Sequence, residues 1–218
     1  MQTHTSVKKM VLLAMLAATA YIIVALIRIP VVAIPPLSYE AKDVVITISG
    51  FMLGPMAAFL ISLVVSLVEM VTISTTGPIG AIMNLLSTCS FACIASLIYK
   101  KKHTIWGAVI GLVCGTVIMV CFMLLWNWLI TPIYLGYPRA AVEAMLIPVF
   151  LPFNALKGGL NTALVLGLYK PLTTALRKAR LLPESTTSHK KAKPGVYILA
   201  GVLLATCVLF LLVMKGVL

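Results

Sequence analysis

Apolar residues run through this chain in blocks that short polar or proline-containing stretches separate. A block of about 20 apolar residues is long enough for a helix to cross a lipid bilayer. Seven apolar segments can be marked out, at residues 10–29, 44–53, 56–72, 79–99, 105–130, 148–169 and 196–214. The segment 44–53 is too short to cross upright, and Gly54 and Pro55 separate it from the next segment. The pattern predicts an all-α integral membrane protein with a short second helix.

Composition agrees with this fold class and limits the function. Of the 218 residues, 61% are hydrophobic and 10% are charged, and the mean hydropathy is +1.12. Soluble domains are usually about half apolar. The membrane segments leave no room for a separate catalytic or ATPase domain. The net charge of +12 comes mostly from short basic clusters between apolar segments, which is a topology signal and not the pattern of a nucleic-acid-binding protein.

The distribution of charge predicts how the chain lies in the membrane. If the N-terminus is cytoplasmic, twelve of the 17 basic residues fall on the inner side, as the positive-inside rule requires. The acidic residues on or near the outer side are then Glu40, Asp43, Glu69 and Glu143. We expect a multi-pass protein of the cell membrane with a cytoplasmic N-terminus, an extracellular C-terminus and proline-stiffened outer loops.

The stretch before the last segment differs from the other connections. It is rich in Lys, Arg, Ser and Thr, a composition typical of an exposed linker. The sequence therefore predicts a compact six-helix membrane domain over residues 1–175, a basic cytoplasmic linker over 176–194 and an accessory transmembrane helix over 195–218.

Polar side chains gather on one face of the sixth segment. Asn154, Lys157 and Asn161 are spaced at i, i+3 and i+7, which places them on the same side of a helix. Buried polar groups in a membrane protein require a partner or a ligand. Lys157 is expected to donate to a bound oxygen, and the alternative is that its side chain extends along its stem to the membrane interface.

Two further asparagines lie in other segments. Asn127 lies between two tryptophans near the predicted outer boundary, where an aromatic belt explains the tryptophans but not the amide. Asn84 belongs to a stripe of small and polar residues with Gly80 and Thr88, for which helix packing is the competing interpretation. Both asparagines are candidate ligand contacts.

The first outer loop is a candidate lid. Pro35 and Pro36 hold its backbone extended, and Leu37, Tyr39 and Ala41 are placed to contact a ligand. Asp43 directly precedes the apolar segment 44–53. We expect its carboxylate to cap the free N–H groups of that helix.

Motifs for catalysis, metal binding and ATP binding are absent from the sequence. There is no HExxH, GxSxG or GxxxxGK[ST] motif, and the five cysteines fall inside apolar segments. Several amides and one ammonium among apolar side chains suit a flat ligand with donor and acceptor edges and hydroxyl groups. Binding is therefore the activity that the residues support best, with no cofactor and no metal expected.

Four stretches share their order and spacing with one family. They are the AxxxA pattern of Ala14 and Ala18, the loop 37–43 followed by GFMLGP, the stretch STTGPIGAIMN at 74–84, and PFNALK at 152–157. This arrangement resembles the substrate-binding S components of energy-coupling-factor (ECF) vitamin importers, and most closely their riboflavin-specific branch. The resemblance covers roughly residues 8 to 175, and the seventh segment lies outside the family's six-helix core.

The resemblance implies a function and a set of partners. It implies high-affinity binding of riboflavin by Asn127, Asn154 and Lys157, with Leu37, Tyr39 and Ala41 lining the site from the lid. Asn161 is added to these ligand contacts because helical spacing places it on the same face as Asn154 and Lys157. Asn84 is a further candidate contact. The implied partners are a transmembrane coupling subunit, which would dock on Ala14 and Ala18, and two cytoplasmic ATPases.

Other functions remain open at this point. Within the family, thiamine or another vitamin is the main alternative ligand, and FMN is a possible additional one. Outside it, an ion-coupled secondary transporter would transport alone under a gradient. A membrane enzyme would need acid–base residues at one depth, and Glu69 and Glu143 are the few candidates.

Overall fold

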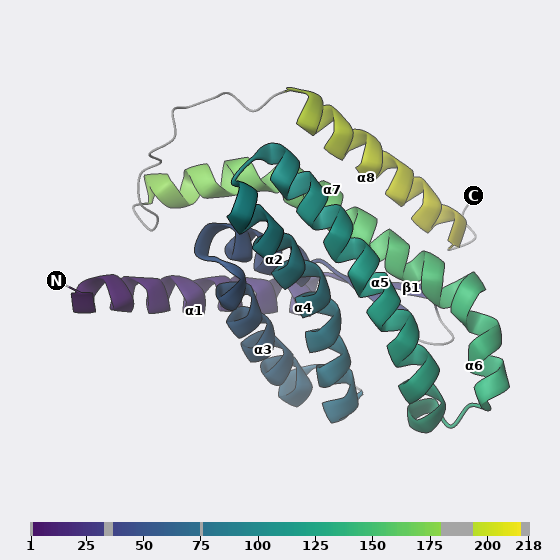
Figure 1. Cartoon of the computed structure of the whole chain (residues 1–218). Coiled ribbons are helices and arrows are strands. Elements are labelled where there is room, and N and C mark those ends of the chain that lie inside the picture. The colour runs from purple at the N-terminus through teal and green to yellow at the C-terminus, as the bar shows by residue number, and fades with distance from the viewer. Residues whose placement is uncertain (1, 33–36, 75, 180–193, 215–218) are drawn as a thin grey trace.

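The computed structural model describes residues 2–32, 37–74, 76–179 and 194–214, and nearly all of them are helical (Figure 1). The helices are α1 (Gln2–Leu26), α2 (Lys42–Leu53), α3 (Pro55–Thr72), α4 (Gly77–Lys102), α5 (Ile105–Leu135), α6 (Arg139–Met145), α7 (Leu151–Lys178) and α8 (Pro194–Met214), with the π-helical turn η1 (Leu146–Phe150) before α7. The described residues contain six helices long and apolar enough to cross a membrane. The predicted helical membrane fold is confirmed.

The short helix α2 lies at the centre of the bundle. It contacts α1, α3, α4 and α7, and all but its last two residues are buried. Gly50 permits the close approach to α4, because a Cβ at this position would collide with the side chain of Ser96. The break after α2 falls at Gly54, whose φ of 96° few other residues adopt, and Pro55 then begins α3. The predicted short second helix, shielded by its neighbours, is present.

Helices α4 and α5 pack closely where α4 ends and α5 begins, and they diverge toward the start of α4 and the end of α5 (Figure 1). A Cβ added at Gly111 would lie 2.7 Å from the carbonyl oxygen of Ala95, and one at Gly115 would lie 2.6 Å from that of Phe91. Only glycine permits so close a contact between a helix and a neighbouring backbone. These two glycines bring α5 close to α4, and both helices continue from this contact to the residues of α4 and α5 that line a cavity described below.

Several helices are longer than the apolar segments that predicted them. The predicted segment 148–169 lies inside a continuous helical stretch of α6, η1 and α7 that spans Arg139–Lys178. Hydropathy marks only the apolar part of a helix, whereas backbone hydrogen bonding continues through the polar residues at its ends. Helix α7 therefore runs into the predicted linker 176–194, of which residues 180–193 lie outside the described residues.

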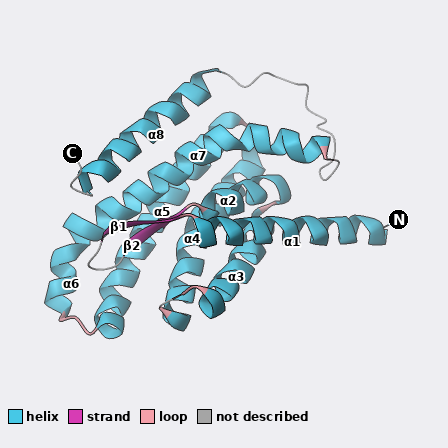
Figure 2. Ribbon diagram, turned by 180° about the vertical axis from the view of Figure 1, so that it is seen from behind, coloured by secondary structure: helices cyan, strands magenta, loops and turns pink. Residues whose placement is uncertain are grey.

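The predicted lid forms a β-hairpin, which the sequence did not indicate. The strands β1 (Arg28–Val32) and β2 (Leu37–Glu40) pair antiparallel, with Arg28 opposite Glu40 and Ile29 opposite Tyr39 (Figure 2). Val31 and Tyr39 of this hairpin pack against apolar residues of α7 and α8. The apolar face of the hairpin explains why it lies against the bundle instead of extending away from it.

Helix α8 lies along α7 (Figure 1). Cys207 is buried against Gly159, where a Cβ would lie 2.7 Å from its sulfur. Most of the other side chains of α8 are exposed. The accessory helix thus covers one side of α7 and presents the rest of its surface outward, as a lipid-facing helix does.

Candidate ligand-binding site

A cavity of about 200 Å³ lies between α4, α5, α7 and the hairpin. It is lined by polar and apolar side chains from all four elements. The lining residues are Arg28, Leu37, Ser38, Glu40, Thr76, Met83, Asn84, Ser87, Met123, Asn127, Phe153, Asn154 and Lys157. The structure therefore brings together five residues that the sequence analysis selected from four separate segments.

Three asparagines from three helices reach this cavity. Asn127 donates to the carbonyl oxygen of Met123 at 2.6 Å, and Asn154 donates to that of Phe150 at 2.8 Å. Asn84 donates to Glu69 Oε2 at 3.1 Å. Each of these bonds uses one amide hydrogen, and an amide offers two hydrogens and an acceptor oxygen. Asn127 Oδ1 also accepts from Thr131 Oγ1 at 2.9 Å. The three side chains are thus held in place by the protein, and each has a second amide hydrogen to offer to a ligand.

Lys157 is held within the bundle by an ion pair. Its Nζ lies 3.1 Å from Asp43 Oδ2 and donates to Ser87 Oγ at 3.2 Å. The residue is 6% exposed, so the alternative in which its side chain extends to the membrane interface does not apply. Lys157 lines the cavity with an ammonium group that Asp43 holds in position.

Asp43 does not cap α2, contrary to the expectation from the sequence. The helix has no side-chain cap, and the fully buried carboxylate of Asp43 accepts hydrogen bonds from Thr88 at 2.7 Å and from Asn161 at 3.3 Å. It also pairs with Lys157. The N-cap position is occupied by Ala41, and Asp43 follows it inside the first turn of α2, where its carboxylate meets the donors of α4 and α7.

Tyr39, Ala41 and Asn161 do not line the cavity. The Tyr39 hydroxyl donates to Asn161 Oδ1 at 2.9 Å, which links the hairpin to α7. Burial and the nearby Asp43 carboxylate raise the pKa of Tyr39, so this hydroxyl stays protonated and remains a donor. Ala41 packs with the apolar face of the hairpin. These three residues lie behind the cavity, where Tyr39 and Asn161 support Asp43.

A second buried cluster of charges joins the hairpin to α2 and α3, and the sequence analysis missed it. Lys42 Nζ lies 2.6 Å from both carboxylate oxygens of Glu69 and 2.8 Å from Glu40 Oε2. Glu40 also pairs with Arg28 at 2.8 Å. Together with the pair of Lys157 and Asp43, the cluster contains three cations and three carboxylates. The balance of charge allows this polar region to be buried.

This arrangement is suited to binding and not to acid–base catalysis or metal binding. The amides, the Ser87 hydroxyl and the Lys157 ammonium are hydrogen-bonding groups beside the apolar side chains of Met83, Met123 and Phe153. The described residues contain no group of three His, Cys, Asp or Glu side chains that would hold a metal ion. Another cavity, of about 280 Å³, lies at the other ends of α4, α5 and α7 and lacks the asparagine cluster.

Comparison with known proteins agrees with a membrane protein that binds a ligand. Residues 8–169 match the family described as ECF transporter, substrate-specific component. The chain belongs to this family. As an S component it is a non-catalytic transport subunit that pairs with an ECF energising module. The alternatives of a membrane enzyme and of an ion-coupled transporter acting alone are therefore set aside.

Two relatives of this S component have curated names. The riboflavin transporter RibU of Staphylococcus aureus (strain TCH60) is 27% identical over 178 residues, which are 78% of this chain and 93% of the relative. The riboflavin transporter FmnP of Bacillus subtilis (strain 168) is 25% identical over 162 residues, which are 70% and 85% of the two chains. A solved structure of the S component of a bacterial ECF transporter superposes with a TM-score of 0.65 at 26% identity, over 81% of this chain and 99% of that chain.

The predicted docking residues of the S component lie on its surface. Ala14 and Ala18 are both exposed on α1, whereas Leu12, Leu16 and Ala20 of the same helix are buried. Small residues spaced by four on an exposed helix face permit close contact with another helix. The face is therefore open, and its use by the coupling subunit remains a prediction.

Glu40 is expected to make the stability of the S component depend on pH. Burial alone would raise its pKa, but the ammonium groups of Lys42 and Lys157 and the guanidinium of Arg28 outweigh burial and hold the pKa below its ordinary value of 4.5. The ionised group therefore stabilises the fold fully above about pH 4.5, and this contribution is lost as the pH falls through the lower folded pKa.

Thermal unfolding of the detergent-purified S component between pH 6 and pH 3 tests this expectation. Glu40→Gln is expected to lower the unfolding midpoint at pH 6 and to flatten its fall toward low pH. Glu143→Gln serves as the control, because Glu143 lies outside the cluster and accepts from Trp128 on an exposed surface. Parallel profiles for the wild type and Glu40→Gln would contradict the assigned role of Glu40.

Proposed function

We propose that the chain is the riboflavin-binding S component of an ECF importer, which captures the vitamin on the extracellular side and delivers it inward when the energising module is bound. The observation that carries the proposal is the convergence of Asn84, Asn127 and Asn154 with Lys157 on one cavity beside Phe153. Both curated relatives named above are riboflavin transporters, which supports the same ligand.

The chemistry of the cavity fits a flavin ring. Riboflavin has a flat ring system with carbonyl oxygens and ring nitrogens along one edge, and a chain of hydroxyl groups. Amide side chains donate and accept at such an edge, and the ammonium of Lys157 donates to a carbonyl or hydroxyl oxygen. Phe153, Met83 and Met123 supply the apolar surface that a flat ring needs.

The start of strand β2 is the part of the site expected to move. Leu37, Ser38 and Glu40 line the cavity from this strand. Pockets that hold a small-molecule ligand usually have a volume of about 300–1,000 Å³. The cavity described here has a smaller volume, about 200 Å³. We expect Leu37, at the start of β2, to move and cover the ligand when riboflavin binds, while Tyr39 and Glu40 keep the rest of β2 fixed to the bundle.

Titration of riboflavin fluorescence with purified variants tests where the ligand binds. Asn154→Ala removes an amide from the cavity wall and is expected to weaken binding roughly tenfold. This is the loss expected for about one hydrogen bond whose contribution lies near the upper end of the usual free-energy range. Asn161→Ala is the matched control, because it removes the same group from a residue of the same helix that does not line the cavity.

The two asparagines are expected to differ in the titration. Since Asn161 acts through Tyr39 and Asp43, its loss is expected to weaken binding less than the loss of Asn154. An unchanged affinity in a folded Asn154→Ala protein would place the ligand outside this cavity. Unfolding midpoints measured without riboflavin show whether each variant is folded.

A further inference from the structure

The cavity at the other end of the bundle has different walls. It has a volume of about 280 Å³ and lies between the C-terminal end of α4, the N-terminal end of α5, the second half of α7 and the start of α8. At about 1.5 Å per residue, Tyr99 in its wall is roughly 20 Å along α4 from Asn84. The cavity is therefore separate from the candidate riboflavin site.

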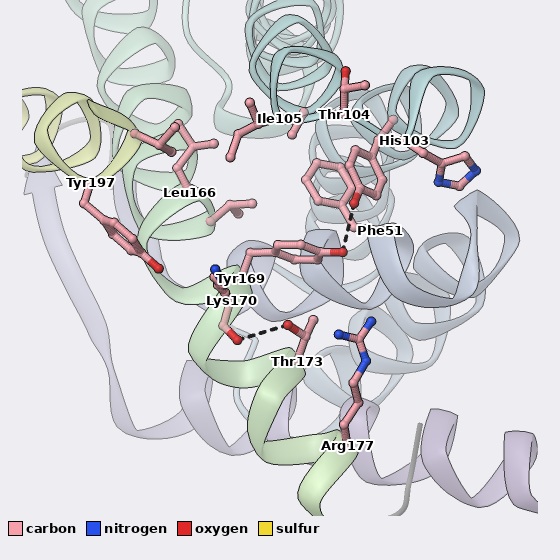
Figure 3. A pocket seen from close by; sticks show the side chains of 14 residues that line it. Phe51, His103, Thr104, Ile105, Leu166, Tyr169, Lys170, Thr173, Arg177 and Tyr197 are labelled. Atoms are coloured by element: carbon pink, nitrogen blue, oxygen red, sulfur yellow. Dashed lines mark hydrogen bonds between the residues drawn. The ribbon is translucent and has the colours of Figure 1, made fainter. Parts of the chain in front are cut away.

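Aromatic side chains form the floor of this cavity. The rings of Phe51 and Tyr99 stack with centroids 4.5 Å apart, and the hydroxyl groups of Tyr99 and Tyr169 are joined by a 3.0 Å hydrogen bond. Figure 3 shows Tyr197 entering from α8 on the opposite side of the cavity from His103. Helix α8 thus completes the wall, which assigns it a structural contribution to this site.

The charged groups of the cavity are basic. Lys170 and Arg177 of α7 line it, and Figure 3 shows the Arg177 side chain directed toward Tyr169. None of the described lining residues is Asp or Glu. Lys100, Lys101 and Lys102 occupy the adjoining last turn of α4. The region has hydroxyl donors and cations, and the four acidic residues of the described part of the chain are used elsewhere.

The depth of the cavity in the membrane follows from where the spanning helices end. The span of α4 ends at Lys102, that of α5 begins at Ile105, and that of α8 begins at Gly195. The cavity is lined by His103, Thr104 and Tyr197, directly at these ends. It therefore lies at the level of the lipid headgroups. With the orientation predicted from the charges, this is the cytoplasmic leaflet, which carries anionic lipids.

We propose that this cavity binds the phosphate group of an anionic phospholipid, with Arg177 as the principal cation and Tyr197 of α8 as part of the wall. A guanidinium presents several donors in a planar fork that matches phosphate oxygens. Of the mutually bonded Tyr99 and Tyr169 hydroxyls, one keeps its hydrogen for a phosphate oxygen, and the apolar outer surface of α8 adjoins the acyl chains. The proposal does not depend on which vitamin the other cavity binds.

Thermal unfolding of the detergent-purified full chain, titrated with short-chain lipids, tests the proposal. Dioctanoyl phosphatidylglycerol is expected to raise the unfolding midpoint at lower concentration than dioctanoyl phosphatidylcholine. Arg177→Gln is expected to weaken the apparent affinity for phosphatidylglycerol roughly fivefold, the effect of about one cation at an anionic membrane surface. Lys178→Gln, the neighbouring exposed residue that does not line the cavity, is the matched control.

Three results would overturn the proposal. Equal stabilisation by the two lipids would show that the anionic headgroup is not recognised. An equal loss of affinity in Arg177→Gln and Lys178→Gln would show that lipids are attracted by the general surface charge. Stabilisation by glycerol phosphate alone, to the same extent as by phosphatidylglycerol, would identify a soluble phosphate compound as the ligand.

Discussion

Lys42→Met is expected to lower the free energy of unfolding by about 3–5 kcal/mol, because it leaves buried carboxylates without their cation. Lys42 is 1% exposed, and its Nζ lies 2.6 Å from Glu69 and 2.8 Å from Glu40. Methionine fills a similar volume, so the loss reports on charge more than on packing. Titration with sodium dodecyl sulfate in mixed micelles measures the unfolding free energy.

Two further variants separate charge from other effects. Combining Lys42→Met with Glu40→Gln and Glu69→Gln removes the unpaired carboxylates and is expected to restore much of the lost stability. Lys178→Met makes the same change at an exposed position and is expected to alter stability by less than about 0.5 kcal/mol. A loss below about 1 kcal/mol for Lys42→Met would show that the cluster is hydrated and of little energetic importance.

Asp43→Ala is expected to lower the free energy of unfolding by about 3–5 kcal/mol, as Lys42→Met does, and to weaken riboflavin binding as well. The substitution leaves Lys157 without its counter-ion and removes the acceptor of Thr88 and Asn161. With Asp43 absent, the Lys157 ammonium is no longer fixed at the cavity wall. The micelle titration measures stability, and riboflavin fluorescence measures binding.

Asp43→Asn is the conservative counterpart of this variant. It keeps an acceptor oxygen for Thr88 but loses the charge that balances Lys157. We expect a smaller loss of stability than in Asp43→Ala, with riboflavin binding still weakened. Wild-type affinity in a folded Asp43→Ala protein would show that Lys157 needs no support from Asp43 at the ligand site.

The membrane architecture and much of the candidate site could be predicted from the sequence. The length of the apolar segments determines how many helices cross a bilayer, and helical spacing placed Asn154 and Lys157 on one face. Buried polar residues are rare in membrane helices, so Asn127 and Asn84 stood out in the same way. The structure places all four of these residues on one cavity.

The charge cluster could not be predicted, because its members are far apart in the sequence. Glu40 was placed among the acidic residues of the outer side, whereas its partner Lys42 pairs also with Glu69, which lies on another helix. Burial of these residues depends on the hairpin lying against the bundle, and its pairing of Arg28 with Glu40 has no signal in hydropathy. The position of Asp43 near the start of a helix suggested a cap, whereas its partners come from α4 and α7.

The most direct test of the proposed function is titration of riboflavin fluorescence with the detergent-purified protein, followed by competition with FMN and thiamine. We predict saturable quenching of riboflavin fluorescence by a single site. An excess of an analogue with the same ring system is expected to reverse the quenching, and an excess of thiamine is not. Unchanged riboflavin fluorescence, together with a thermal stabilisation of the protein by thiamine, would contradict the proposed ligand while leaving the S-component fold in place.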